Sequence, residues 1–183
     1  MQSPNSAQQD PIPDPKIEKK KREIPLDIRP YNPDTDRAFV FSSWLQSFQS
    51  STFSCLIPKD VYFSAQHKVI EMLLKRSQVF MACDQDDNDH IYAYIVGEYL
   101  KSVGQEVFAL HWMYVKSSFR GFDIPRKLLA QYEFKERNYY THDNSFMRKI
   151  ALYVYLRHNP YMIFLGGDEN GKPNQQNETH GEI

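Results

Sequence analysis

The chain has 183 residues, of which 41% are hydrophobic and 14% aromatic, and its formal net charge is −1. This length and apolar content predict one globular domain with a hydrophobic core. The near-neutral charge argues against a large basic surface for nucleic acid or membrane. No apolar run approaches the length of about 18 residues that a membrane-spanning helix needs. The N-terminus has no apolar signal core, so we expect a cytoplasmic protein.

The two cysteines and six histidines do not form a metal-binding pattern. Cys55 and Cys83 lie far apart and form no CxxC pair, which argues against a disulfide framework and a zinc site and fits a reducing compartment. The histidines show no spacing typical of metal ligands. The sequence also contains no Gly-x-Ser-x-Gly elbow and no Walker loop. We therefore expect no metal site.

Both ends of the chain have the composition of disordered tails. Residues 1–24 are polar, rich in proline, and end in the basic run "KIEKKKRE". Residues 166–183, "GGDENGKPNQQNETHGEI", are polar and rich in Gly and Asn. The basic run is typical of a solvated tail, although it also suits a contact with nucleic acid or an acidic partner. The folded domain is therefore expected at 25–165.

The first part of the folded region predicts a strand and two helices. "LDIRPYN" indicates a short strand, after which Asn32 can cap a helix that has Pro33 in its first turn. The helix is expected over 34–48 and a second one over 59–75. The second helix is expected to bury the stripe Val61, Ala65, Val69 and Leu73.

The next part changes to the period of strands. "QVFMACD" and "HIYAYIVGEY" predict a hairpin, and "EVFALHWMYVK" predicts a long third strand. A helix is expected over 124–137, with Leu128, Leu129 and Tyr132 on its apolar face. "NYYTHD" indicates a short strand and "PYMIF" a last one, whereas "SFMRKIALYVYL" fits helix or strand. The order is β-α-α-β-β-β-α-β-(α)-β, an α+β fold.

The stretch 117–129, "SSFRGFDIPRKLL", joins the long strand to the next helix. As a helix start it is sound, because Asp123 is an ordinary N-cap and Pro125 falls in the first turn, where a missing N–H does no harm.

The order of elements resembles that of the GCN5-related N-acetyltransferases, which have a mainly antiparallel central sheet flanked by helices. That family carries a long strand, a loop of the form Arg/Gln-x-x-Gly-x-Gly/Ala, and a helix. "LHWMYVKSSFRGFDIPRKLL" supplies all three in order, with Arg120 and Gly121 on the first positions of the loop. "IRPYNPDTDRAFVFSSWL" looks like the family's first strand and helix. The resemblance covers nearly all of 25–165, and "LHWMYVKSSFRG" looks like acetyltransferases encoded by bacteriophages and prophages.

The resemblance implies acetyl-CoA as the cofactor. In the family, backbone amides at the start of a helix point at the pyrophosphate, and the long strand pairs with the pantetheine amides. The implied pantetheine contacts are the backbone groups of Tyr114, Val115 and Lys116. The implied pyrophosphate contacts are the amides of Gly121, Phe122, Asp123 and Ile124, with Arg120, Arg126 and Lys127 offsetting the charge.

The sequence departs from the family at both later glycines of the loop. Asp123 brings a carboxylate towards two phosphates, and Pro125 lacks one N–H donor. These residues either exclude coenzyme A or reposition it.

Several side chains are candidates for acid–base chemistry. His111, within the long strand, suits a general base near neutral pH, or a hydrogen-bonded histidine beside Trp112. Glu98 suits a base that acts through water, or a solvated carboxylate at a strand end. His142 would lie near the point where the strands splay, or in a surface turn. Tyr153 and Tyr155 occupy the region where the family's tyrosine acid falls.

The sequence therefore leads to two hypotheses. The first is an acyl-CoA-dependent N-acetyltransferase whose acceptor amine belongs to a protein, a small molecule or a modified base. The second is a catalytically silent domain of the same fold that has lost coenzyme A binding and acts as an interaction protein.

Overall fold

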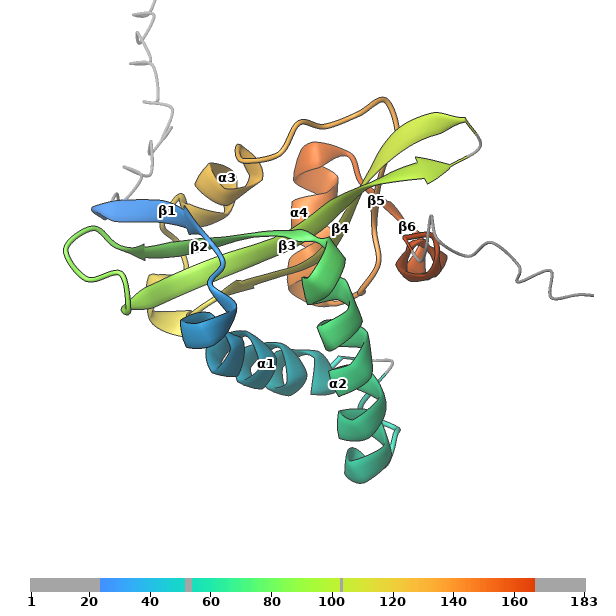
Figure 1. Cartoon of the computed structure of the whole chain (residues 1–183), viewed down its shortest axis with the longest axis horizontal. Coiled ribbons are helices and arrows are strands. Elements are labelled where there is room, and N and C mark those ends of the chain that lie inside the picture. Colours follow the sequence, from blue (N-terminus) through green and yellow to red (C-terminus); the bar gives the residue numbers. More distant parts are fainter. Residues whose placement is uncertain (1–23, 52–53, 103, 167–183) are drawn as a thin grey trace, which may run out of the picture.

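A computed structural model describes residues 24–51, 54–102 and 104–166. The predicted tails thus lie outside the described residues, apart from Ile24 and Gly166. The chain forms one six-stranded sheet in sequential order (Figure 1). Its strands are β1 (Leu26–Pro30), β2 (Gln78–Asp84), β3 (Ile91–Ser102), β4 (Gln105–Val115), β5 (Asn138–Tyr140) and β6 (Arg157–His158).

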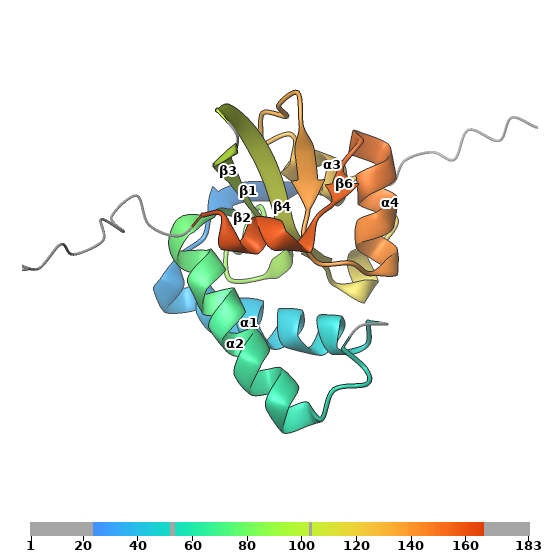
Figure 2. The ribbon, with the colours of Figure 1, turned by 90° about the vertical axis from the view of Figure 1, so that its right-hand side faces the viewer.

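Helices cover both faces of this sheet. Two of them, α1 and α2, lie against one face, and α3 and α4 lie on the other (Figures 1 and 2). Strands β1 to β4 are antiparallel, whereas β5 is parallel to β4 and to β6. The predicted α+β class and element order are confirmed. The helices span Pro33–Gln49 (α1), Lys59–Arg76 (α2), Ile124–Leu129 (α3) and Ser145–Val154 (α4).

The predicted start of α1 is confirmed. Asn32 accepts a hydrogen bond from the amide of Asp34 at 3.0 Å, and Pro33 occupies the first turn. The buried carboxylate of Asp36 accepts from the amide of Asn32 and pairs with Arg29 at 2.7 Å. This ion pair ties the helix to β1.

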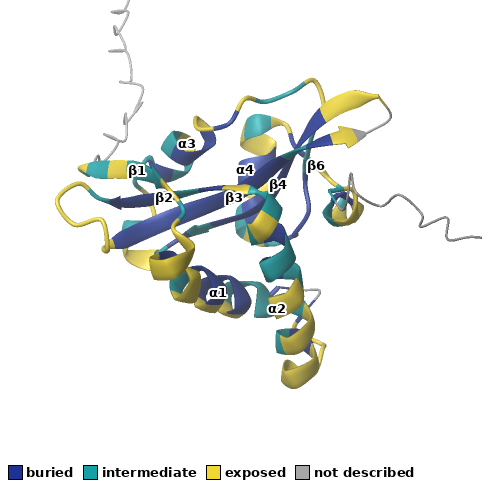
Figure 3. Ribbon diagram, in the orientation of Figure 1, coloured by how far each residue is buried: buried dark blue, intermediate teal, exposed yellow. Residues whose placement is uncertain are grey.

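The predicted apolar stripe of α2 is confirmed at its C-terminal end and was wrong at its start. Leu73 is fully buried and Val69 packs against the core, whereas Val61 is 54% exposed and Ala65 is exposed. The first turns of α2 project beyond the sheet and are largely exposed (Figure 3), and Tyr62 is the side chain that is buried there.

Two predicted elements near the C-terminus also needed correction. Helix α3 ends at Leu129 instead of 137, yet Tyr132 is still buried, and its hydroxyl donates to the carbonyl of Gln78. "PYMIF" is a 3₁₀ helix, Pro160–Phe164, because Asn159 caps it and Pro160 begins its first turn. The ambiguous segment 144–156 holds helix α4, which Asn144 caps by accepting from the amide of Met147.

The sheet is buried on both faces at its centre (Figure 3). On the α1 side, the rings of Trp44 and Trp112 stack with centroids 5.4 Å apart. On the α3 side, Phe108 packs against Tyr132 at 4.9 Å and against Phe134 at 5.5 Å. No helix within the described ranges combines the length and apolar character of a membrane span.

Gly97 is the tightest point of this core and gives a test of it. A Cβ there would lie 2.8 Å from two ring carbons of buried Phe108, and the backbone of β3 cannot move away from the sheet. We expect Gly97→Ala to lower the free energy of unfolding by about 1–3 kcal/mol, as overpacking does. Gly104→Asn, at a positive φ of 75° with open space around it, is the control and should change stability by less than about 1 kcal/mol. Equal midpoints in urea for both variants would contradict this packing.

Candidate functional site

Strands β4 and β5 separate partway along their length and open a fork. They pair only at Phe108–Leu110, and the amide of Thr141 then donates to the carbonyl of Leu110 at 3.1 Å. Beyond this point β4 continues to Val115 beside no part of β5. The β5-side edge of residues 112–115 is therefore left without a strand partner.

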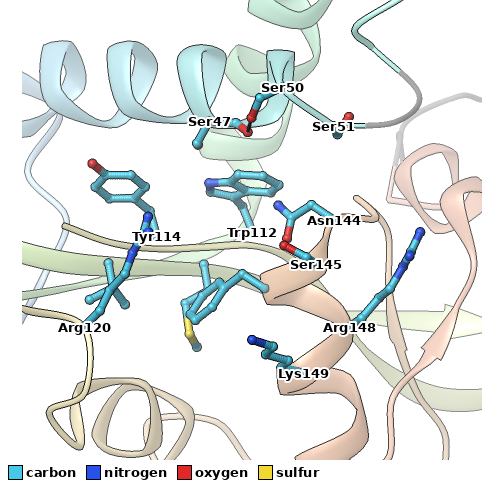
Figure 4. Close-up of a pocket in the computed structure, with 13 residues that line it drawn as sticks. Ser47, Ser50, Ser51, Trp112, Tyr114, Arg120, Asn144, Ser145, Arg148 and Lys149 are labelled. Carbon is cyan, nitrogen blue, oxygen red and sulfur yellow. Dashed lines mark hydrogen bonds between the residues drawn. The ribbon is translucent and has the colours of Figure 1, made fainter. Parts of the chain in front are cut away.

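The fork opens into a cleft of about 530 Å³. Its floor is the end of β4, one wall is the C-terminal end of α1, and the opposite wall is the start of α4 (Figure 4). The turn before α3 contributes Arg120. The residues that line the cleft are Ser47, Ser50, Ser51, Trp112, Met113, Tyr114, Val115, Arg120, Asn144, Ser145, Phe146, Arg148 and Lys149.

The cleft carries positive charge. Among the described residues that line it, three are cationic and none is Asp, Glu or His. Arg148 points away from β4 and donates to Asp143 from Nε at 2.8 Å, which holds the pKa of that carboxyl below its usual value (Figure 4). Lys149 points from α4 towards β4.

A β-bulge in β4 sets which side chains lie behind the cleft. The register passes from Val96–Trp112 to Gly97–Leu110, so His111 has no partner in β3. This extra residue turns His111 and Trp112 to the same face of the sheet. Trp112 meets α1 there, and His111 meets Glu98, which pairs with Arg76 of α2 at 3.0 Å.

His111 belongs to a continuous chain of buried hydrogen bonds. Its Nε2 lies 2.7 Å from Glu98 Oε1, and its Nδ1 lies 3.1 Å from Thr141 Oγ1. Thr141 Oγ1 lies 2.9 Å from His142 Nδ1, and His142 Nε2 lies 3.0 Å from Gln66 Nε2. The chain crosses the fork at the residue where β4 and β5 part.

Neutral rings give this chain one consistent set of bond directions. The carboxylate of Glu98, which pairs with Arg76, accepts from His111 Nε2–H, and His111 Nδ1 accepts from the Thr141 hydroxyl. The Thr141 oxygen accepts from His142 Nδ1–H, and His142 Nε2 accepts from the amide of Gln66. In this arrangement each ring nitrogen of both histidines is used.

Burial favours the same neutral forms. Loss of solvation lowers the pKa of His111, against the opposing effect of Glu98. Loss of solvation, with the nearby His111, lowers the pKa of His142 to about 3.

None of the predicted acid–base residues lines the cleft. His111 and Glu98 lie together behind its floor, and Glu98 is buried instead of solvated. His142 is also buried, in a box formed by Trp44, Phe48 and Trp112 instead of a surface turn. Tyr153 and Tyr155 are 61% and 88% exposed and lie outside the cleft lining. Their catalytic roles stay predictions.

Of the residues implied to hold coenzyme A, three line the cleft: Tyr114, Val115 and Arg120. Lys116 lies outside the lining, and its backbone amide donates to the carbonyl of Tyr92 at 2.9 Å. The turn residues stand beside the cleft and outside its lining, namely Gly121, Phe122, Asp123, Ile124, Arg126 and Lys127. Their roles also stay predictions.

Asp123 was predicted to cap α3, and the structure confirms its position but not a cap hydrogen bond from its side chain. The residue stands at the cap position, but its side chain makes no cap hydrogen bond. Its carboxylate lies 3.7 Å from the guanidinium of Arg126 one turn later.

Sequence reasoning missed two walls of the cleft. The α4 wall went unseen because 144–156 fits helix or strand equally well, although Asn144 is a typical N-cap residue and marks the helix start. The serines of α1 carry no such signal, since only the fold brings them over β4. They are Ser47, Ser50 and Ser51.

Comparison with solved structures identifies the fold. The GCN5-related glucosamine N-acetyltransferase region of a fungal multi-domain GH3 β-N-acetylglucosaminidase matches 73% of this chain, with a TM-score of 0.51 and 14% identity. This chain spans 17% of that protein. A possible acetyltransferase from Clostridium difficile 630 matches 71% of this chain and 88% of its own, with a TM-score of 0.49 and 17% identity. A putative acetyl transferase from Pyrococcus furiosus matches 86% of this chain and 99% of its own, with a TM-score of 0.48 and 14% identity.

The fold is thus that of the GCN5-related N-acetyltransferases, as the sequence predicted. No protein-family model and no curated protein matches the chain. Within the described ranges, no group of three or more His, Cys, Asp or Glu side chains gathers in a way that could hold a metal ion.

Thr141→Val tests the hydrogen-bond chain at the fork. The substitution keeps the shape of the side chain but leaves a nitrogen of His111 and one of His142 unpaired in a buried site. We expect the free energy of unfolding in urea to fall by about 2–4 kcal/mol, because each unsatisfied buried group costs about 1–3 kcal/mol. Thr35→Val, which removes a hydroxyl bond near the surface to Asp36, is the matched control and should cost under about 1 kcal/mol. Equal losses of unfolding free energy in the Thr141→Val and Thr35→Val variants would contradict the hydrogen-bond chain at the fork.

The neutral histidines also predict how stability depends on pH. Their folded pKa values lie below the unfolded value of about 6.5, so below pH 6.5 the unfolded chain binds protons that the folded chain does not. Stability is therefore full above pH 6.5. It should fall by about 1.4 kcal/mol per pH unit through His142 as the pH drops towards 4, because the folded pKa of this group is about 3. His111, whose folded pKa is also lowered, adds to the fall below pH 6.5. Chemical denaturation of His142→Asn between pH 7 and 4 should show a shallower fall than the wild type. Identical slopes would contradict the assignment.

Proposed function

We propose that this protein is an acyl-CoA-dependent N-acyltransferase that transfers an acetyl group to an amine. The observation that carries the proposal is the cleft at the β4–β5 fork, set in the fold of the GCN5-related N-acetyltransferases. A cleft volume of about 530 Å³ lies in the range of pockets that hold small ligands.

The bare edge of β4 suits an arm that contains amides. Residues 112–115 are extended and lie beside no part of β5, while their neighbours in β3 pair on the other side. Such an edge offers backbone N–H and C=O groups to an extended ligand, as a sheet edge does to an added strand. Tyr114 and Val115 supply this edge, and Trp112, Met113 and Phe146 add apolar groups to the lining.

The turn before α3 suits the phosphate end of the same ligand. Gly121 has a φ of 95°, a conformation that glycine adopts readily, and Arg120 reaches the cleft beside it. The carboxylate of Asp123 is paired with Arg126, which reduces its repulsion of a phosphate. Among the described residues, no carboxylate lies within ion-pair distance of Arg120.

Bound acetyl-CoA would supply an acyl thioester, on which an N–C bond would form and the C–S bond would break, with the proton lost by the amine nitrogen passing to the leaving thiolate or to water. The chain's contribution is to hold the reacting groups together and apart from water. His111 and Glu98 remain proposals for the base and Tyr153 and Tyr155 for the acid, although their positions outside the cleft lining argue against direct contact with the amine.

The stretch "LHWMYVKSSFRG" supports the further proposal of a phage- or prophage-encoded enzyme. The cysteines Cys55 and Cys83, which form no CxxC pair, fit the further proposal of a cytoplasmic location.

A catalytically silent binding domain is the second candidate. It is favoured by the cleft lining, in which the described residues include no Asp, Glu or His that could take a proton. On this hypothesis the fork still binds an extended ligand, but no thioester is cleaved.

Acetyl-CoA binding tests the proposal first. Ligand at about 100 times the dissociation constant should stabilise the protein by about 2.7 kcal/mol and raise its melting midpoint by several degrees. Calorimetry should show the matching heat. Arg120→Gln should weaken acetyl-CoA binding. Arg37→Gln is the control and should leave binding unchanged, because Arg37 pairs with Glu71 away from the cleft. No shift and no heat at millimolar acetyl-CoA would overturn the proposal, and binding without thiol release for any amine would favour the silent domain.

The double variant Asp123→Gly, Pro125→Gly addresses the altered loop in the same titration. Tighter binding would mean that the two residues hinder the phosphates. Weaker binding would mean that the turn is adapted as it stands.

A further inference from the structure

We infer that the acceptor is a primary amine that carries an anionic group, a carboxylate or a phosphate, within a few bonds of its nitrogen. This inference rests on the proposed function and names the substrate class of the same site. Two features carry it: the uncompensated charge on the α4 wall, and the hydrogen-bond acceptors on the α1 wall.

Lys149 is the charged group that would meet the acceptor. It points from α4 into the cleft, and among the described residues it has no carboxylate within ion-pair distance (Figure 4). Its neighbour Arg148 differs, because that guanidinium points away and is balanced by Asp143. Lys149 also lies on the wall opposite α1, whereas Arg120 lies at the turn proposed for the phosphates of coenzyme A. Lys149 is therefore free to pair with an anionic group of the acceptor, apart from the phosphates.

The α1 wall offers acceptors for the N–H groups of an amine. The hydroxyl of Ser47 donates to the carbonyl of Ser43, and that of Ser50 donates to the carbonyl of Ser47 at 3.0 Å. A serine has one hydroxyl hydrogen and two lone pairs, so both oxygens are left to accept. Both side chains line the cleft. An amine can thus be held without a carboxylate.

This charge pattern also decides which amines react. Acyl transfer needs the neutral amine, and the described residues of the lining include no carboxylate that would stabilise the ammonium form. A bound amine would therefore lose its proton to water without a dedicated base, in keeping with a lining that contains no Asp, Glu or His among its described residues. A polycation would be repelled from the same cleft, whereas an anionic group beside the nitrogen would pair with Lys149.

A matched series of primary amines tests the inference. Its members share an aminoethyl group and differ only in the substituent at the end opposite the nitrogen. That substituent is a carboxylate in β-alanine, a phosphate in O-phosphoethanolamine, a methyl group in propylamine and an ammonium in ethylenediamine. Release of free thiol from acetyl-CoA gives kcat/KM for each at equal concentrations of neutral amine.

The anionic members of the series should react fastest. We expect one or both of them to exceed propylamine by about fivefold, the effect of one half-exposed ion pair, and ethylenediamine to fall below it. The two anionic members distinguish carboxylate from phosphate.

Charge reversal at one lysine assigns the effect to the cleft. Lys149→Glu should reverse the order of the anionic and cationic amines and change the calorimetric dissociation constant for acetyl-CoA by less than about twofold. Lys68→Glu, an equal charge change at an exposed position of α2 outside the cleft, should keep the wild-type order.

Three results would overturn the inference while acetyl-CoA still binds. They are turnover that favours ethylenediamine or ignores the substituent, turnover of propylamine with none of either anionic amine, and a Lys149→Glu variant that binds acetyl-CoA more weakly but keeps the order of amines. The last would place Lys149 at the cofactor. Failure of the proposed function is recognised separately, by the absence of calorimetric heat with acetyl-CoA in the wild type or by binding without thiol release for any amine.

Discussion

The hydroxyl of Thr141, held between His111 and His142, is the contact on which the site depends. It stands at the residue where β5 leaves β4, so the strands are tied at the root of the fork and free beyond it. The bulge in β4 makes this contact available by adding one residue, His111, which has no partner in β3. The same insertion turns Trp112 onto α1, and the stacked ring of Trp44 holds the wall that carries the cleft serines.

All the ring nitrogens in the hydrogen-bond chain at the fork already have partners. Every ring nitrogen of His111 and His142 is used, and both rings are neutral and buried. A group in that state takes up a proton only if the chain breaks or reverses, at a cost that burial increases. A histidine on a central strand suggests a base from sequence, and the structure also gives it hydrogen-bond partners that tie the fork together, while its catalytic role stays a prediction. The charged and polar groups that line the cleft are those of its walls.

The sequence predicted local features well and long-range ones poorly. The start of α1 follows from Asn32 and Pro33, because a cap and a fixed φ act within one turn. The central strands follow from their apolar runs rich in Val, Ile and Tyr, which are bounded by polar turns. Burial of Glu98 could not be foreseen, because it depends on Arg76, distant in sequence, and on Gly166, whose close approach covers the carboxylate. The cleft wall formed by α1 could not be predicted either, because it also depends on contacts between residues that are distant in sequence.

The altered loop shows why a missing motif residue need not mean a lost site. Glycine is required where φ is positive, and in this turn that holds at Gly121, with a φ of 95°. Asp123 has a φ of −78°, which any residue adopts, and Pro125 lies in the first turn of α3, where its fixed φ suits the helix. The backbone thus takes its course without further glycines. Asp123 adds a negative charge to the turn, and Pro125 removes one N–H donor from it. Arg126 offsets part of the charge of Asp123. Asp123 and Pro125 therefore change the electrostatics and hydrogen bonding of the turn relative to the family pattern, but they do not change the path of its backbone.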